Sequence, residues 1–166
     1  MIYKYKTTFT RPGNATTYSA GDAVCNSDGD VLTLVPGGSF SHGRIVGAKL
    51  SISNGNAPLT NATFELLLFN DDANIPTLTD NSAFAMTAAA EEDLIGYTTF
   101  ALETTGSSGS SVAWDVNSGL LIPFEWKKVS GVAQSIYGVL TTTAAYDPIS
   151  ENTVVDVTVY VEELPA

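Results

Sequence analysis

Alternating apolar and polar residues along the chain predict a protein built from short β-strands. The alternation is clearest near the end, over residues 154–161. There every second residue from Val155 to Val161 is valine, while Asp156, Thr158 and Tyr160 occupy the intervening positions. This pattern is typical of a strand with one buried face and one face in contact with solvent.

Two central segments carry the same signal. In residues 44–53, one side is expected to hold Val46, Ala48, Leu50 and Ile52, and the other to hold Lys49, Ser51 and Ser53. In residues 62–69, Phe64, Leu66 and Leu68 share a face, but Leu67 and Phe69 are also apolar. The second strand is therefore expected either to be covered on both sides or to meet a partner.

Further strands are predicted at residues 2–9, 23–25, 31–35, 94–102, 112–116, 120–127 and 134–142. Residues 11–14, Arg-Pro-Gly-Asn, should end the first of these strands with turn chemistry. One or two short helical turns are expected near residues 80–93, with Asp80 or Asn81 as the cap and Phe84 on the helix.

These elements predict an all-β fold, an antiparallel β-sandwich of jelly-roll-like type. The length of 166 residues fits a single domain covering 1–166. Its N-terminal strand or arm, residues 1–12, is a candidate for use in assembly. An incomplete barrel would give the same periodicity.

Composition narrows the class of function. The chain has 18 acidic and seven basic residues and a formal net charge of −11, which disfavours nucleic acid as a partner. Lys4, Lys6 and Arg11 nevertheless fall within the first eleven positions. They could dock on an acidic partner, or they could be solvated residues that keep an edge strand from pairing.

Candidate catalytic chemistry is sparse. His42 is the only histidine, and no nucleophile-elbow sequence surrounds a serine. Cys25 is the only cysteine and is expected to be a buried structural thiol. We therefore expect a protein that is not an enzyme, with no catalytic, metal-ligating or cofactor-binding residues. No segment has the apolar length of a membrane helix, and no cleavable export signal is expected.

The two tryptophans leave an alternative open. Trp114 and Trp126 lie on predicted strands, and Trp126 is near Phe124. Exposed aromatic rings on a sandwich face can stack on sugars, whereas inward rings fill a core or a subunit contact. A carbohydrate-binding module is thus the alternative to a structural role.

Several segments resemble the small β-rich virion structural proteins of tailed bacteriophages. The likeness covers roughly the first hundred residues and rests on Phe9-Thr10-Arg11-Pro12, residues 18–24 (Tyr-Ser-Ala-Gly-Asp-Ala-Val), Leu67-Leu68-Phe69, Pro76, residues 80–84 (Asp-Asn-Ser-Ala-Phe) and residues 93–96 (Asp-Leu-Ile-Gly). The carboxy-terminal third agrees with that group only in its β character.

The resemblance implies a capsid decoration or cement protein that binds the outside of the assembled head, usually as a homo-oligomer such as a trimer. Its partner would be the major capsid protein, and it would be made in the host cytoplasm and reside on the outer capsid surface. A tail- or fibre-associated position is a variant of this role. The expected assembly contacts are Lys4, Lys6, Arg11, Phe124, Trp126 and Lys127, with an intrachain carboxylate as the other possible partner for Arg11.

Overall fold

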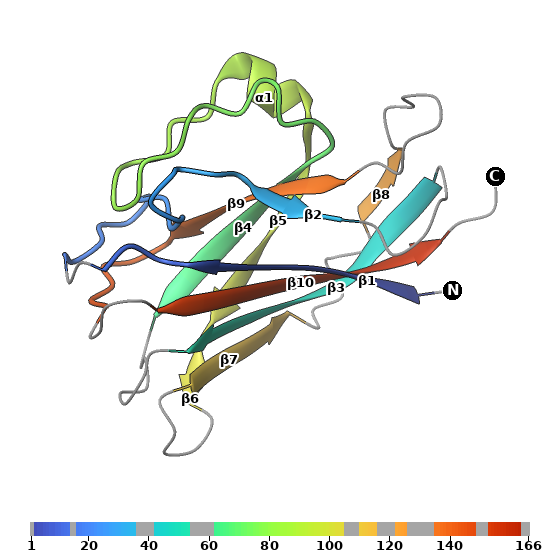
Figure 1. Cartoon of the computed structure of the whole chain (residues 1–166). Coiled ribbons are helices and arrows are strands. Elements are labelled where there is room, and N and C mark those ends of the chain that lie inside the picture. Colours follow the sequence, from blue (N-terminus) through green and yellow to red (C-terminus); the bar gives the residue numbers. More distant parts are fainter. Residues whose placement is uncertain are drawn as a thin grey trace.

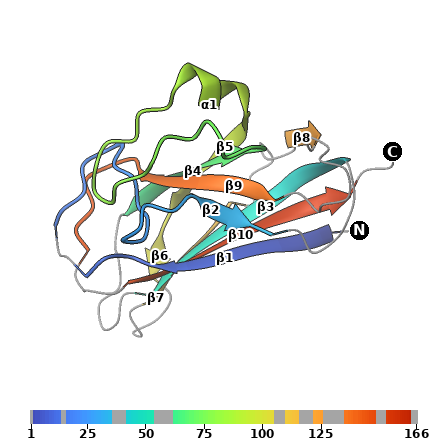
Figure 2. The same cartoon turned by 45° about the horizontal axis from the view of Figure 1, so that its top comes forward.

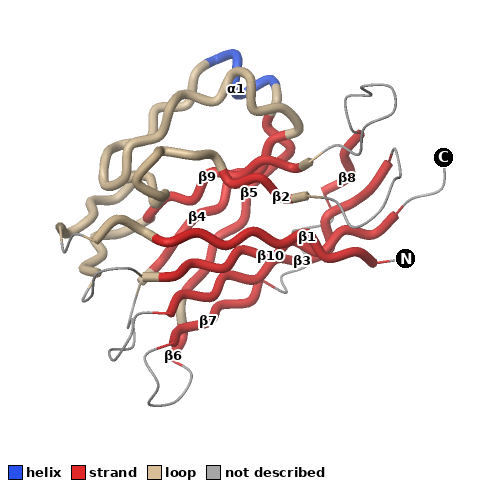
Figure 3. The backbone as a smooth tube through the Cα atoms, in the orientation of Figure 1, coloured by secondary structure: helices blue, strands red, loops and turns tan. Residues whose placement is uncertain are grey.

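The computed structural model describes residues 2–13, 16–35, 42–53, 62–104, 110–115, 122–125, 135–148 and 153–163. Within them, ten strands form two antiparallel sheets that pack face to face, and one short helix lies outside the sheets (Figures 1 and 3). Strand neighbours come from distant parts of the chain, as in a jelly roll. The prediction of an all-β antiparallel sandwich is confirmed.

The larger sheet has the order β1-β10-β3-β7-β6, and β8 also pairs with β3. Its strands are β1 (Ile2–Thr10), β10 (Val154–Glu163), β3 (His42–Ser53), β7 (Ser110–Asp115), β6 (Glu103–Thr104) and β8 (Ile122–Glu125). The smaller sheet has the order β2-β9-β4-β5. Its strands are β2 (Leu32–Leu34), β9 (Ile136–Thr142), β4 (Thr63–Phe69) and β5 (Leu94–Ala101).

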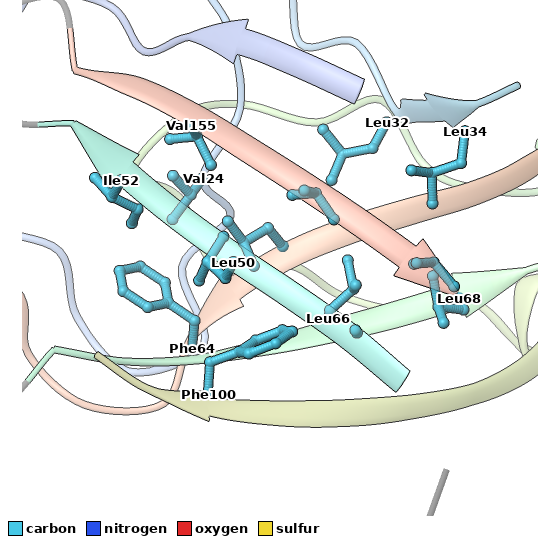
Figure 4. Packing of buried hydrophobic residues seen from close by; sticks show 14 of the residues in the cluster. Val24, Leu32, Leu34, Leu50, Ile52, Phe64, Leu66, Leu68, Phe100 and Val155 are labelled. Carbon is cyan, nitrogen blue, oxygen red and sulfur yellow. The ribbon is translucent and has the colours of Figure 1, made fainter. Parts of the chain in front are cut away.

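The main core lies between the two sheets (Figure 4). The alternate valines of β10, from Val155 to Val161, are all at most 1% exposed and face Phe64, Leu66 and Leu68 of β4. Burying a side chain of this size contributes about 1.5–3 kcal/mol. The alternation in β10 and β4 therefore marks the faces that hold the sheets together.

The alternation in β3 is interrupted by a β-bulge that sequence reasoning missed. Tyr160 pairs with Gly47 and Val161 with Ile45, so Val46 has no opposing residue. As a result Ile45 is fully buried, whereas Val46 is only half-buried and does not belong to the core. The placement of Val46 beside Ala48 on the core face was wrong, because an extra residue in one strand reverses the side-chain alternation.

A second apolar layer covers the outer face of the smaller sheet. Leu67 and Phe69 of β4 pack there with Cys25, Leu78 and Ala90. The cover is the chain's own segment between β4 and β5, which folds back over the sheet (Figures 1 and 2). Leu67 and Phe69 are thus covered on the second side by the same chain, the first of the two predicted alternatives.

The helix in this cover is α1 (Ala88–Glu92), so helical structure occurs within the predicted residues 80–93. Its N-cap is Thr87, whose hydroxyl oxygen accepts from the backbone N–H of Ala90 at 3.1 Å. The expectation of a cap at Asp80 or Asn81, and of Phe84 on the helix, was wrong. Asp80 is engaged in a buried cluster instead, and so it cannot cap α1.

Candidate functional site

A basic face lies on the outer side of the larger sheet, formed by Lys4 and Lys6 of β1 and Lys49 of β3. Tyr5 and Leu50 beside them are fully buried, so strand alternation directs the lysines away from the core. In the register of the sheet, Lys6 and Lys49 both pair with Thr158 of β10. Among the described strands, β1 lies at the end of the sheet order and pairs only with β10. We call this basic surface the lysine face.

Side chains of β10 organise the lysine face. Lys6 Nζ lies 3.0 Å from Asp156 Oδ1, and the Thr8 hydroxyl donates to the same oxygen. Lys4 Nζ lies 5.9 Å from the centre of the Tyr160 ring, within the range of a cation–π contact. A hollow of about 240 Å³ is lined by Lys4, Lys6, Asp156 and Tyr160 together with Lys49, Ser51 and Thr158. Ammonium, hydroxyl and carboxylate groups thus border one depression.

The titration of Asp156 reflects this basic surrounding. Partial burial acts to raise the pKa of its carboxyl group, but hydrogen bonds from Thr8 and Lys6 act in the opposite direction. The positive charges of Lys6 and Lys49 add to that effect, and the net result is a lowered pKa. The surface potential here favours a carboxylate, although the whole chain is strongly acidic.

Basic charge is concentrated on this sheet. Five of the seven basic residues are described, and four of them lie on the outer face of the larger sheet: Lys4, Lys6, Arg44 and Lys49. Arg44 Nε donates to Glu162 at 2.7 Å. The Lys6 side chain is 56% exposed, and an exposed pair contributes only about 0–1 kcal/mol. Lys6 can therefore exchange Asp156 for the carboxylate of another molecule at little cost.

Arg11, another expected assembly contact, lies inside the molecule. Its side chain is 0% exposed, and its Nη1 lies 3.7 Å from Asp80 Oδ2 and donates to the Tyr18 hydroxyl at 3.0 Å. The Tyr18 hydroxyl donates to Asp80 Oδ1 at 2.6 Å, and the same oxygen accepts from the Cys25 backbone N–H at 3.2 Å. Arg11 thus has the intrachain carboxylate partner that was left open above, and it presents no surface to another chain.

This buried cluster joins the segment after β1 to the cover of the smaller sheet. Burial raises the pKa of Tyr18, and its hydrogen bond to Asp80 raises it further, so the phenol stays protonated and donates. The Tyr18 ring also stacks on Tyr146 with ring centres 5.4 Å apart. The lysine-face hollow is lined by other residues. We therefore assign the cluster to the stability of the fold.

The remaining expected contacts fall largely outside the described part of the chain. Trp126 and Lys127 lie outside the described residues, while Phe124 lies in β8, where it pairs with Gly43. Trp114 pairs with Lys49 in β7. Only the backbone pairing of β7 and β8 is described, so the use of these aromatic residues in assembly or in sugar binding stays a prediction.

Sequence reasoning missed Lys49, Asp156 and Tyr160 as members of the site. Alternation placed Lys49, Asp156 and Tyr160 on polar faces, but it did not show that β10 lies between β1 and β3. Cys25, in contrast, was identified as a buried thiol, and the structure confirms this. Among the described residues, no helix is both long enough and apolar enough to cross a membrane.

Comparison with known proteins gives distant structural likenesses only. No family model matches the chain, and no curated protein matches its sequence. A structure of the cyanophage Pam1 capsid asymmetric unit is similar at 14% identity, covering 99% of this chain and 84% of that one, with a TM-score of 0.34. The decameric BFDV capsid protein is similar at 15% identity, with coverage of 97% and 96% and a TM-score of 0.40. For Desmodium yellow mottle tymovirus the values are 10% identity, 100% and 90% coverage, and a TM-score of 0.30.

Proposed function

We propose that this chain is a virion structural protein, a decoration or cement protein that binds the outside of an assembled phage head and bridges neighbouring capsid subunits. The observation that carries the proposal is the lysine face on an otherwise acidic molecule. The sequence resemblance to small β-rich virion proteins of tailed phages is the reason for proposing a phage head as the partner.

The charge of the chain supports an exterior position. A net charge of −11 is unfavourable beside packaged DNA, because nucleic-acid phosphates repel acidic surfaces. On the outside of a shell, the acidic surface can face solvent while the lysine face contacts acidic groups of the shell. Ionic strength would weaken such binding, since exposed charges are screened over about 10 Å at 0.1 M salt.

The mechanism relies on binding energy. Lys4, Lys6 and Lys49 contact carboxylates on adjacent capsid subunits, and the filled sandwich core keeps their spacing constant. A sheet carries these charges on a rigid surface, so little backbone entropy is lost on binding. Association of several copies multiplies the contacts and links subunits that would otherwise separate under internal pressure.

Purified protein mixed with undecorated phage heads tests the proposal. We expect the protein to co-sediment with heads, to raise the temperature at which the shell opens, and to be released by added salt. Failure to bind heads, or binding without any gain in shell stability, would contradict a cement role. Preferential binding to isolated tails would assign the protein to the tail instead.

Three variants test the lysine face. Lys4→Ser/Lys6→Ser/Lys49→Ser should lose head binding, whereas replacing the same three lysines with arginine should preserve it. As a control, Thr79→Glu/Ala89→Glu/Thr99→Glu lowers the net charge by three units, as the serine variant does, but at exposed positions away from the lysine face. If the control loses binding as fully as the serine variant, net charge decides recruitment and the lysine face does not.

A further inference from the structure

A second hollow, distinct from the lysine face, opens where the two sheets meet along one side. It has a volume of about 550 Å³ and lies between residues 7–9 of β1, residues 30–33 leading into β2, and residues 75–77 of the cover. In Figures 1 and 2, β1 and β2 run side by side in opposite directions at this side of the sandwich. We call this hollow the edge cleft.

The edge cleft is bordered by strands that each end a sheet. Within the described residues, β1 pairs only with β10 and β2 pairs only with β9, and no ladder joins β1 to β2. In this described part of the chain, each strand thus has one edge whose peptide groups are not used in a ladder. Such an edge is a template for an added strand from another chain.

The charged residues that line the edge cleft are all acidic: Asp28, Asp30 and Asp72. All three are exposed, and Asp30 is held in place by Asn26, whose Nδ2 donates to its Oδ2 at 2.9 Å. The negative potential also reaches Tyr137, whose pKa is raised by burial and then by Asp72 and Asp71. A cationic occupant fits this cleft on charge grounds.

Apolar groups lie beside these aspartates. Phe9, Val31 and Ile75 are partly buried, and each lines the cleft. An extended peptide places successive side chains on opposite sides, so one set can meet the aspartates while the alternate set meets the apolar groups. The pattern complementary to the cleft is therefore an alternation of basic and aliphatic residues.

We propose that the edge cleft binds an extended basic segment of a partner protein, which adds as a strand to the free edge of β1. The inference goes beyond the proposed function and does not depend on it, because no residue lines both the edge cleft and the lysine-face hollow. Main-chain hydrogen bonds to β1 supply affinity, and the aspartates select a cationic sequence.

A fluorescent peptide of alternating lysine and valine, mixed with the purified full chain, tests the proposal by fluorescence anisotropy. We expect saturable binding that is lost when glutamate replaces lysine. Methylation of the backbone nitrogens on one edge of the peptide removes ladder donors and should weaken binding about tenfold or more. Binding of the glutamate peptide, or of the methylated peptide, as tight as that of the original peptide would overturn the proposal.

Matched protein variants locate the binding. Asp28→Asn/Asp72→Asn should weaken peptide binding about fivefold, whereas Glu91→Gln/Glu92→Gln removes the same charge at exposed positions on α1 and should not. Thr33→Tyr should obstruct the cleft, and Thr99→Tyr on the exposed face of β5 serves as its control. Circular dichroism and thermal melting establish that each variant is folded. Binding that survives both cleft variants would overturn the assignment.

Light scattering distinguishes the occupant. A dimer of the unmodified chain that Asp28→Asn/Asp72→Asn converts to a monomer would show that a second copy fills the cleft, and this would overturn the assignment to a partner peptide. A size unchanged by that variant, together with peptide binding to the wild type, supports it. Head binding that fails while peptide binding succeeds would count against the proposed virion role alone.

Discussion

Replacing Arg11 with methionine is expected to destabilise the fold strongly. Methionine approximates the arginine stem but lacks the charge and the donors, so the Asp80 carboxylate would stay buried without its cation. The side chains of Arg11 and Asp80 are 0% and 7% exposed. Removing one partner of a buried ion pair costs about 3–5 kcal/mol. Asp80 keeps the Tyr18 hydroxyl and the Cys25 N–H as donors, which places the expected loss near about 3 kcal/mol.

For a chain of this size, a loss of about 3 kcal/mol lowers the melting temperature by roughly 6–12 °C. Urea denaturation monitored by tryptophan fluorescence measures the free energy of unfolding directly. The matched control is Arg44→Met, which removes the same side chain from the exposed pair with Glu162, where the two side chains are 39% and 33% exposed. That change should cost only about 0–1 kcal/mol.

A double-mutant cycle separates the ion pair from simple loss of packing. Arg11→Met/Asp80→Asn leaves neither member of this ion pair charged, so it should cost at least about 1 kcal/mol less than the sum of the two single variants. We infer that the buried cluster stabilises the packing of the cover against the segment after β1. Equal losses of unfolding free energy in Arg11→Met and Arg44→Met would refute this inference. Strict additivity in the double-mutant cycle would refute it as well.

Three further predictions concern single residues. Thr87→Ala should lower the free energy of unfolding by about 1 kcal/mol in urea denaturation, because the N-cap of α1 loses its acceptor; an unchanged value would contradict that role. Gly29→Ala should be far more destabilising than Gly21→Ala in thermal melting. Both glycines have positive φ, which is strained for alanine. A Cβ at Gly29 would also lie 2.2 Å from the Leu78 carbonyl oxygen, whereas a Cβ at Gly21 would meet nothing within 4 Å. Equal losses would contradict the close approach. Burial raises the pKa of Cys25 to about 12, so labelling by a thiol reagent at mildly alkaline pH should be slow in the native state and should accelerate only as urea unfolds the chain; rapid native labelling would contradict its burial.

The strands and their faces were largely predictable from the sequence because side-chain alternation is a local property of an extended chain. It located β10 and β4 and identified their core residues. It failed at Val46, since a β-bulge depends on how β3 pairs with β10 and leaves no mark in the alternation itself. The cap of α1 was misplaced for a related reason. Asp80 has a suitable side chain, but its carboxylate accepts from the Tyr18 hydroxyl and the Cys25 backbone N–H and pairs with Arg11.

The candidate site was predictable only in part. Lys4 and Lys6 were identified from their place on an early strand, but Lys49 and Asp156 are distant in sequence and meet them only through the strand order β1-β10-β3. Arg11 shows the opposite case. A charged residue near the N-terminus is expected at the surface, but Arg11 is buried, where it forms an ion pair with Asp80.

By itself, the sequence determined that the chain forms an antiparallel sandwich, which strand faces are buried, and that its basic residues are few and unevenly placed. Only the tertiary structure decided which strands are neighbours, where the register shifts, and which charges face one another. The physical reason is that the alternation of side chains depends on neighbouring residues in the chain. Strand pairing and charge contacts depend instead on residues that are far apart in the sequence, such as Ile2 and Glu162, which pair across 160 positions.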